Sequence, residues 1–175
     1  ILDTIISRSS IINFNNIEFQ KHYDFLIQND INENIAKITP KISFGDINYS
    51  LKLSNNFKET TKILEELIDS LINSNLANWE KKFKNIKEKN NIIEVITLLN
   101  ILLSDAYKYK NNEKNIYFSN LEKYLSLLSK SQSLNIEKFN QIINKTINNI
   151  NLNGYIPLMT SALYIDLNKQ LNTNL

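Results

Sequence analysis

Hydrophobic side chains along most of this 175-residue chain recur every three to four positions, which is the spacing of an amphipathic α-helix. Residues 63–72 are apolar at positions i, i+1, i+4, i+5, i+8 and i+9, which predicts a helix with one buried stripe. Residues 92–107 are apolar on most sides and therefore predict the central helix of a bundle. Further helices are expected over residues 79–89, 119–129, 136–150 and 157–171.

The chain begins with a different pattern. Residues 4–14 are rich in isoleucine and predict a β-strand rather than a helix. A single strand is not stable without neighbouring strands, so its sheet is expected to lie in sequence upstream of Ile1. Because the chain also starts without methionine, we expect it to be the C-terminal part of a longer protein.

A group of short helices is expected between this strand and the polar residues 54–56, which predict a boundary. The first helix begins near Asn16, where the spacing of apolar residues becomes helical. Its apolar face is formed by Phe19, Tyr23, Leu26 and Ile27. A second helix should end at Thr39, because Pro40 disfavours helical geometry in the residue before it. A third is expected over residues 45–53, so the chain is predicted to be all-α, with a three-helix unit followed by a bundle of five to six helices.

Composition narrows the classes of function. Hydrophobic residues make up 42% of the chain, which is enough for a packed core, and the formal net charge is only +2. So small a charge gives no general reason to expect a nucleic-acid or membrane partner. The chain has no cysteine, which excludes disulfide bonds and thiolate metal sites within it. No apolar run approaches the ~20 residues of a membrane span, and we expect a cytoplasmic protein without membrane contact.

Residues that usually carry catalysis are sparse. The chain has only two glycines, too few for a glycine-rich phosphate loop. His22 is the single histidine, and its place on an amphipathic helix predicts a surface residue rather than a metal ligand or catalytic base. The carboxylates of Glu65, Glu66 and Asp69 lie on one helix opposite its hydrophobic stripe, where charges normally face solvent. No intrinsic enzymatic activity, cofactor or metal site is therefore expected in this chain.

A lysine-rich segment covers the predicted helix over residues 79–89 and allows two interpretations. Lysines interleaved with Trp79 and Phe83 are typical of a surface that binds nucleic acid. The alternative is a solvated helix face whose aromatic side chains point inward. Glu80 and Glu88 dilute the positive charge and favour this second interpretation. The lysines concerned are Lys81, Lys82, Lys84, Lys87 and Lys89.

Arg8 is the single arginine among 20 lysine and arginine residues, and it stands between Ser7 and Ser9. A guanidinium group stays charged and presents a fixed fork of donors, which suits phosphate recognition better than an ammonium group does. The alternative is a structural salt bridge at the end of the predicted strand. The residues themselves leave both interpretations open.

The sequence around Arg8 resembles the SRC segment of clamp-loader subunits in the AAA+ ATPase family, whose fuller pattern is L-P-T-I-R-S-R-C-Q. The matching positions are Leu2, Thr4, Ile5, Ser7 and Arg8, and the departures are Asp3, Ser9 and Ser10. Residues 35–51 are similar to the lid-domain pattern L-A-x-x-[AS]-x-G-S-x-R-x-A-L of the same family. Asn48 stands where ATP-hydrolysing members carry a second phosphate-sensing arginine. This departure indicates a subunit that does not hydrolyse ATP, such as those of the delta-prime type in the bacterial DNA polymerase III clamp loader.

The resemblance implies a division of the chain into three parts. Residues 1–14 would be the end of the AAA+ core, residues 15–54 a three-helix lid domain, and residues 55–175 a helical collar domain. In the family, the collar holds the five subunits of the loader together. The expected partners are therefore the other clamp-loader subunits, whereas the sliding clamp and the primer-template DNA would be contacted only indirectly.

In the same family, the arginine of the SRC segment reaches the ATP of a neighbouring subunit. The resemblance therefore assigns Arg8, with Ser7 and Ser9 beside it, as an arginine finger that acts in trans during loading of the sliding clamp in DNA replication. Three alternatives remain open. The chain could belong to the ATPase motor subunit, against which Asn48 argues, to an unrelated helical interaction module, or to a nucleic-acid-binding module built on the lysine-rich helix.

Overall fold

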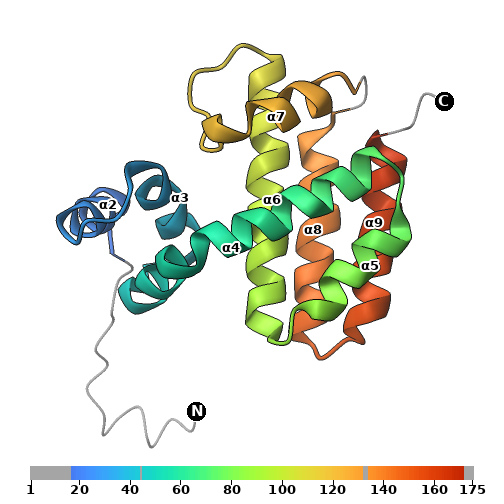
Figure 1. Cartoon of the computed structure of the whole chain (residues 1–175), viewed down its shortest axis with the longest axis horizontal. Helices are drawn as coiled ribbons and strands as arrows, with labels where there is room; N and C mark the ends of the chain where they lie inside the picture. The colour runs from blue at the N-terminus through green and yellow to red at the C-terminus, as the bar shows by residue number, and fades with distance from the viewer. Residues whose placement is uncertain (1–16, 44, 132–133, 172–175) are drawn as a thin grey trace, which may run out of the picture.

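The computed structural model describes residues 17–43, 45–131 and 134–171, and every regular element within them is helical (Figure 1). The prediction of an all-α chain is confirmed for these residues, and the strand predicted over residues 4–14 lies outside them. The α-helices are α2 (Phe19–Gln28), α3 (Glu33–Ser43), α4 (Ile47–Ile72), α5 (Leu76–Asn85), α6 (Lys89–Lys110), α7 (Glu122–Ser129), α8 (Ile136–Asn151) and α9 (Ile156–Leu171). A short 3-10 helix, η1 (Ser119–Leu121), leads into α7.

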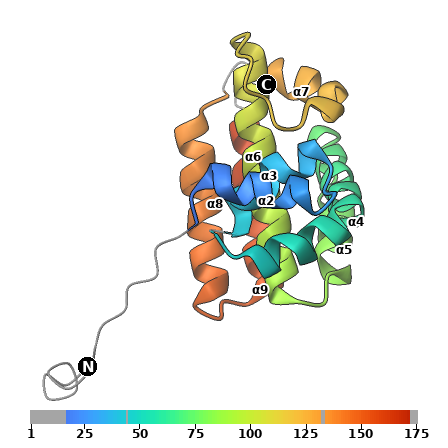
Figure 2. The same cartoon turned by 90° about the vertical axis from the view of Figure 1, so that its left-hand side faces the viewer.

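Two parts can be distinguished in the fold (Figure 1), and Figure 2 views the molecule with α2 and α3 in front of the bundle. The small unit consists of α2, α3 and the first turns of α4, and the bundle contains the rest of α4 together with α5 to α9. Helix α6 lies at the centre of the bundle, in contact with α4, α7 and α8, and α9 packs against α5 and α8. Helix α4 crosses α6 and joins the two parts (Figure 1). The position of the small unit therefore depends on this helix and on the contacts beside it.

The continuity of α4 is the main departure from the expected element boundaries. A helix over residues 45–53 followed by a break at residues 54–56 is wrong, because α4 continues without interruption to Ile72. The hydroxyl of Ser54 donates a 2.7 Å hydrogen bond to the carbonyl of Ser50 one turn earlier, so this polar side chain is satisfied within the helix. Leu53 and Phe57 on either side are both buried. Their packing holds the helix through a polar sequence, and the division into two domains stays a prediction.

Helix α3 also continues past its expected end. Pro40 lies inside the helix, which extends to Ser43, so the predicted stop at Thr39 is wrong. Proline removes one backbone donor and normally costs about 3 kcal/mol in a helix interior. Here it falls in the final turn, where Ile38 and Ile42 are buried in the core. Apolar burial on both sides of the proline outweighs the local preference.

The core of the bundle agrees with the hydrophobic pattern. The apolar residues of α6 are its centre, as predicted, and Trp79 of α5 is fully buried against α9. The indole N–H of Trp79 donates a 2.9 Å hydrogen bond to the carbonyl of Thr160, and its ring centroid lies 5.5 Å from that of Tyr164. Burial of a tryptophan with its N–H satisfied fixes α5 on α9. The fully buried side chains of α6 include Ile96, Leu98, Leu99, Leu102 and Leu103.

Four helices end in the same way, without glycine. Asp30, Ser74, Asn112 and Asn153 have positive φ angles of 60°, 50°, 56° and 63° just after α2, α4, α6 and α8. In each case the amide of this residue and the amide of the next one donate to carbonyls of the last helical turn. This pattern is the Schellman motif, which glycine usually completes. In a chain with two glycines, short polar residues take the left-handed position instead.

Candidate functional site

The residues predicted to act on a phosphate, Ser7, Arg8 and Ser9, lie outside the described part of the chain. Their role as an arginine finger therefore stays a prediction. Asn48, the other position singled out by the resemblance, is exposed in the first turn of α4. That turn is capped by Asp46, whose carboxylate accepts a 2.9 Å hydrogen bond from the amide of Tyr49. Asn48 thus occupies a regular, capped helix start, with its side chain toward solvent.

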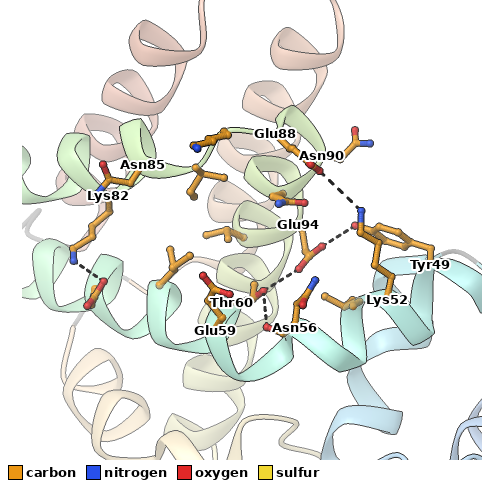
Figure 3. A pocket seen from close by; sticks show the side chains of 17 residues that line it. Tyr49, Lys52, Asn56, Glu59, Thr60, Lys82, Asn85, Glu88, Asn90 and Glu94 are labelled. Atoms are coloured by element: carbon orange, nitrogen blue, oxygen red, sulfur yellow. Dashed lines mark hydrogen bonds and ion pairs between the residues drawn. The ribbon is translucent and has the colours of Figure 1, made fainter.

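A cleft of about 590 Å³ lies between α4 and the segment that joins α5 to α6 (Figure 3). One face of α4 forms one wall over several turns, from the small unit to the middle of the bundle, and the start of α6 forms the other. Leu53, Ile63 and Val95 provide apolar lining. The charged side chains on its walls include Lys52, Glu59, Glu66, Lys82, Lys87 and Glu88.

Glu94 is the most deeply placed charged group of this cleft, with 7% of its surface exposed. One carboxylate oxygen accepts a 3.1 Å hydrogen bond from the hydroxyl of Tyr49, and the other lies 3.2 Å from the hydroxyl of Thr60 (Figure 3). The Thr60 hydroxyl can donate either to Glu94 or to the carbonyl of Asn56, also 3.2 Å away. Both bonds to Glu94 come from α4, so this carboxylate ties α6 to α4.

Burial sets the protonation behaviour of this group. It raises the pKa of Glu94, while the hydrogen bonds from Tyr49 and Thr60 and the charge of Lys52 act in the opposite direction. Burial, followed by the nearby charge of Glu94, also raises the pKa of Tyr49 well above its usual value. A sequence signal for this site existed, because Glu94 interrupts the apolar run of the central helix. Its partners could not be read from the sequence, since they lie 45 and 34 residues away.

Two ion pairs lie at the edges of the cleft and join its walls. The Lys82 ammonium lies 2.6 Å from a Glu66 oxygen, and the Lys52 ammonium lies 4.0 Å from Glu88. These partners neutralise each other, so the cleft has no strong net charge to attract an ionic ligand. Within the described residues, no group of three or more His, Cys, Asp or Glu side chains is placed to hold a metal ion. The arrangement suits structural linkage better than covalent chemistry.

The structure corrects the placement of His22. It was expected on the surface, but only 1% of it is exposed, and its Nε2 atom has no hydrogen-bond partner among the described residues. Burial lowers the pKa of His22, and the charge of Asp46 acts against this effect. The cause is a rotation of α2 relative to the expected face. His22 and Leu26 point inward, one turn apart, whereas Phe19 and Ile27 are exposed.

The lysine-rich helix does not form an aromatic binding surface. Trp79 and Phe83 are buried, which confirms that they point inward, so neither ring of this helix is available for a base to stack on. Lys82 is paired with Glu66, and Lys89 donates a 3.2 Å hydrogen bond to the carbonyl of Asn151. The segment is therefore a solvated helix face with structural contacts.

The acidic cluster on α4 is likewise occupied within the fold. Glu66 pairs with Lys82, and Asp69 accepts a 3.1 Å hydrogen bond from the hydroxyl of Tyr124. Burial, together with that hydrogen bond, raises the pKa of Tyr124 to about 12. The expectation that these carboxylates only face solvent is incomplete, because two of them fasten α4 to α5 and α7.

Comparisons with other proteins do not identify a family for this chain. Searches against protein-family models, curated proteins and solved structures find no match for this chain. Among the helices that the structure describes, none has an apolar stretch long enough to cross a membrane. Any functional conclusion therefore rests on the motif resemblance and on the geometry described above.

Proposed function

We propose that this chain is the C-terminal part of a delta-prime-type clamp-loader subunit, which acts as a scaffold and stator and offers Arg8 to the ATP of a neighbouring subunit. The observation that carries the proposal is the pair of motif resemblances at residues 2–14 and 35–51. The helical character of the described residues is compatible with it. The parent assembly would be the loader of the DNA polymerase III holoenzyme. This chain itself would have no enzymatic activity.

The rigid connection between the small unit and the bundle supports the role of a stator. A stator has to hold its trans-acting residue in a fixed position relative to the surface that binds its neighbours. Helix α4 runs through both parts without a break. The bond from Tyr49 to Glu94 fastens its first turns to α6. A third link comes from α3, where the Lys41 ammonium lies 4.7 Å from the centre of the Tyr117 ring.

The residue at position 48 supports a subunit that does not hydrolyse ATP. An asparagine cannot replace the permanent charge and the donor fork with which an arginine senses a phosphate. The chemistry of the finger would instead be that of a cation placed against the phosphates, which stabilises negative charge in the transition state. Arginine fingers contribute about 10³- to 10⁵-fold to the rate.

The test is reconstitution of the clamp loader from its full-length subunits, with Arg8→Ala or Arg8→Lys in this one. We expect DNA-stimulated ATP turnover and clamp loading to fall with both variants, because lysine lacks the planar fork of donors. Asn48→Ala is the matched control, since Asn48 is exposed and is given no role in hydrolysis. Unchanged turnover and loading with Arg8→Ala would refute the finger assignment.

Assembly distinguishes this proposal from its alternatives. A delta-prime-type subunit should co-purify with the other loader subunits even when Arg8 is replaced, because the finger is separate from the helices that hold the assembly. An unrelated helical interaction module would not co-purify with them. A fragment of the motor subunit would have a phosphate-binding loop upstream and would lose ATP binding when that loop is altered.

A further inference from the structure

The turn between α8 and α9 and the first turn of α9 carry the most exposed large hydrophobic side chains in the described part of the chain. Leu152 is 82% exposed, Tyr155 72% and Leu158 59%. Ile165, which is 44% exposed, continues this surface two turns further along α9. Exposed apolar side chains that gather in one region often mark an interaction site. We call these four residues the α9 patch.

The backbone of this turn is rigid. Asn153 adopts a positive φ angle of 63°, and the amide of Gly154 donates a 2.8 Å hydrogen bond to the carbonyl of Asn149. A side chain at Gly154 would meet that same carbonyl oxygen at 2.7 Å, so only glycine fits. Leu152 and Tyr155 are therefore presented by a turn with a defined backbone, and little backbone entropy is lost when they are covered.

A groove of about 580 Å³ lies directly beside the α9 patch, between α5 and the first turns of α9 (Figure 1 shows the two helices). Phe83, Ile86 and Pro157 are among its apolar lining residues, and Tyr155 and Leu158 of the patch form part of its wall. Exposed apolar side chains and an apolar groove thus lie next to each other. Such a surface can pair with itself about a two-fold axis, because the same patch is then used on both copies.

The α5 rim of the groove carries one negative and one positive side chain, which can pair with the opposite charges of a second copy. Glu80 and Lys84 are exposed, lie one turn apart on α5, and both line the groove. A two-fold axis that sets two copies of α5 antiparallel would place Glu80 of each copy opposite Lys84 of the other, which gives two reciprocal ion pairs. The carboxylate of Glu80 also accepts a 2.7 Å hydrogen bond from the hydroxyl of Ser161, which holds it on this rim. A carboxylate has further acceptor positions for the partner lysine.

We propose that the α9 patch and the groove beside it are covered by a second copy of this chain in a two-fold symmetric dimer. The two Glu80–Lys84 pairs form at the rim of the groove, and Leu152 and Tyr155 of each copy lie within the contact. This inference does not rest on the proposed function, since it uses only the shape and charge of this face.

The test is the molar mass of the 175-residue chain in solution, measured by sedimentation equilibrium over a wide range of concentration. We expect the mass to rise from 20.4 kDa toward twice that value, with a dissociation constant in roughly the micromolar range. Leu152→Ser should weaken association at least about tenfold. Leu127→Ser is the matched control, because Leu127 is also exposed but lies on α7, which Figure 1 shows at the opposite end of the bundle. It should leave the dimer unchanged.

A charge swap tests the symmetry of the contact. Glu80→Lys should weaken the dimer at least about tenfold, because two lysines then face each other at both ends of the interface. The double variant Glu80→Lys with Lys84→Glu should restore the wild-type constant to within about threefold. Far-ultraviolet circular dichroism verifies that each variant is folded. A monomer at every concentration, equal effects of Leu152→Ser and Leu127→Ser, or a double variant that stays as weak as Glu80→Lys would each overturn the proposal.

Discussion

Asp105 fastens the loop between α6 and α7 to the bundle and gives the sharpest stability prediction. Its side chain is completely buried near the end of α6. The Oδ2 atom accepts hydrogen bonds from the backbone amides of Tyr117 and Phe118, each 2.8 Å long. The Oδ1 atom lies 3.4 Å from the Lys108 ammonium. Phe118 is itself fully buried, so the two amide bonds hold a core side chain in place.

Replacing Asp105 with alanine should lower the free energy of unfolding much more than replacing it with asparagine. A hydrogen bond to a charged group contributes about 1.5–3 kcal/mol net, and an amide left without a partner in the core adds to the loss. Burial raises the pKa of Asp105 despite these bonds, which shows that desolvation offsets part of the gain. We therefore expect Asp105→Ala to lower the free energy of unfolding by about 3 kcal/mol. Asp105→Asn can place its carbonyl oxygen at the Oδ2 position and keep both amide bonds, so its cost should be about 1 kcal/mol.

Urea unfolding at neutral pH, followed by circular dichroism and by the fluorescence of the single tryptophan, measures both values. Asp24→Ala is a suitable control, because Asp24 is exposed and accepts its hydrogen bond from the neighbouring Gln20 side chain. It should change the free energy of unfolding by less than about 0.5 kcal/mol. If Asp105→Ala costs as little as this control, or if Asp105→Asn costs as much as Asp105→Ala, the two amide bonds do not hold the loop.

Three further predictions concern groups in other parts of the fold. Glu94 has a raised pKa, so the folded state holds its proton more tightly than the unfolded state, and its contribution to stability declines as pH rises from 4.5 through the folded pKa. Glu94→Gln, which can still pair with Tyr49, should remove this decline when urea unfolding is compared across that pH range. His22 has a lowered pKa, so stability should be lost as pH falls from 6.5 through the folded pKa. His22→Leu should abolish that loss in thermal unfolding at acidic and neutral pH, and a loss that persists would show that other groups cause it. Asp30→Gly at the left-handed position after α2 should stabilise the fold by about 1 kcal/mol, since glycine relieves the strain and a negative charge leaves the end of the helix. The corresponding rise in Tm is about 2–4 °C, and a fall would contradict the strain argument.

The bundle helices could be predicted from the sequence because their apolar spacing and their end signals agree. Helix α8 was expected over residues 136–150 and runs from Ile136 to Asn151. The side chain of Asn135 accepts from the amide of Lys138 at its start, and Asn153 takes the left-handed position just after its end. The capping residues and the buried apolar positions of α8 indicate the same boundaries. The apolar spacing was therefore enough to predict this helix.

The small unit could not be predicted as well, because its boundaries depend on contacts between helices. Pro40 and Ser54 carry the local signals of a helix end, yet both lie inside helices held by buried neighbours. His22 and Phe19 lie on adjacent faces of α2, and the apolar residues of this ten-residue helix are spread too widely around it to determine its rotation. The partners of Glu94 and Asp105 are set by packing between segments far apart in the sequence, which periodicity does not report.

The unbroken α4 changes what a clamp-loader resemblance implies for motion. A hinge at residues 54–56 would let the small unit swing relative to the bundle. In this fold, such a swing has to break α4 beside the buried Leu53 and Phe57 and separate Tyr49 from Glu94. Loss of one hydrogen bond to a charged group alone costs about 1.5–3 kcal/mol, before any broken backbone bonds are counted. We therefore expect the small unit to move together with the bundle, which is the property that the proposed stator role requires.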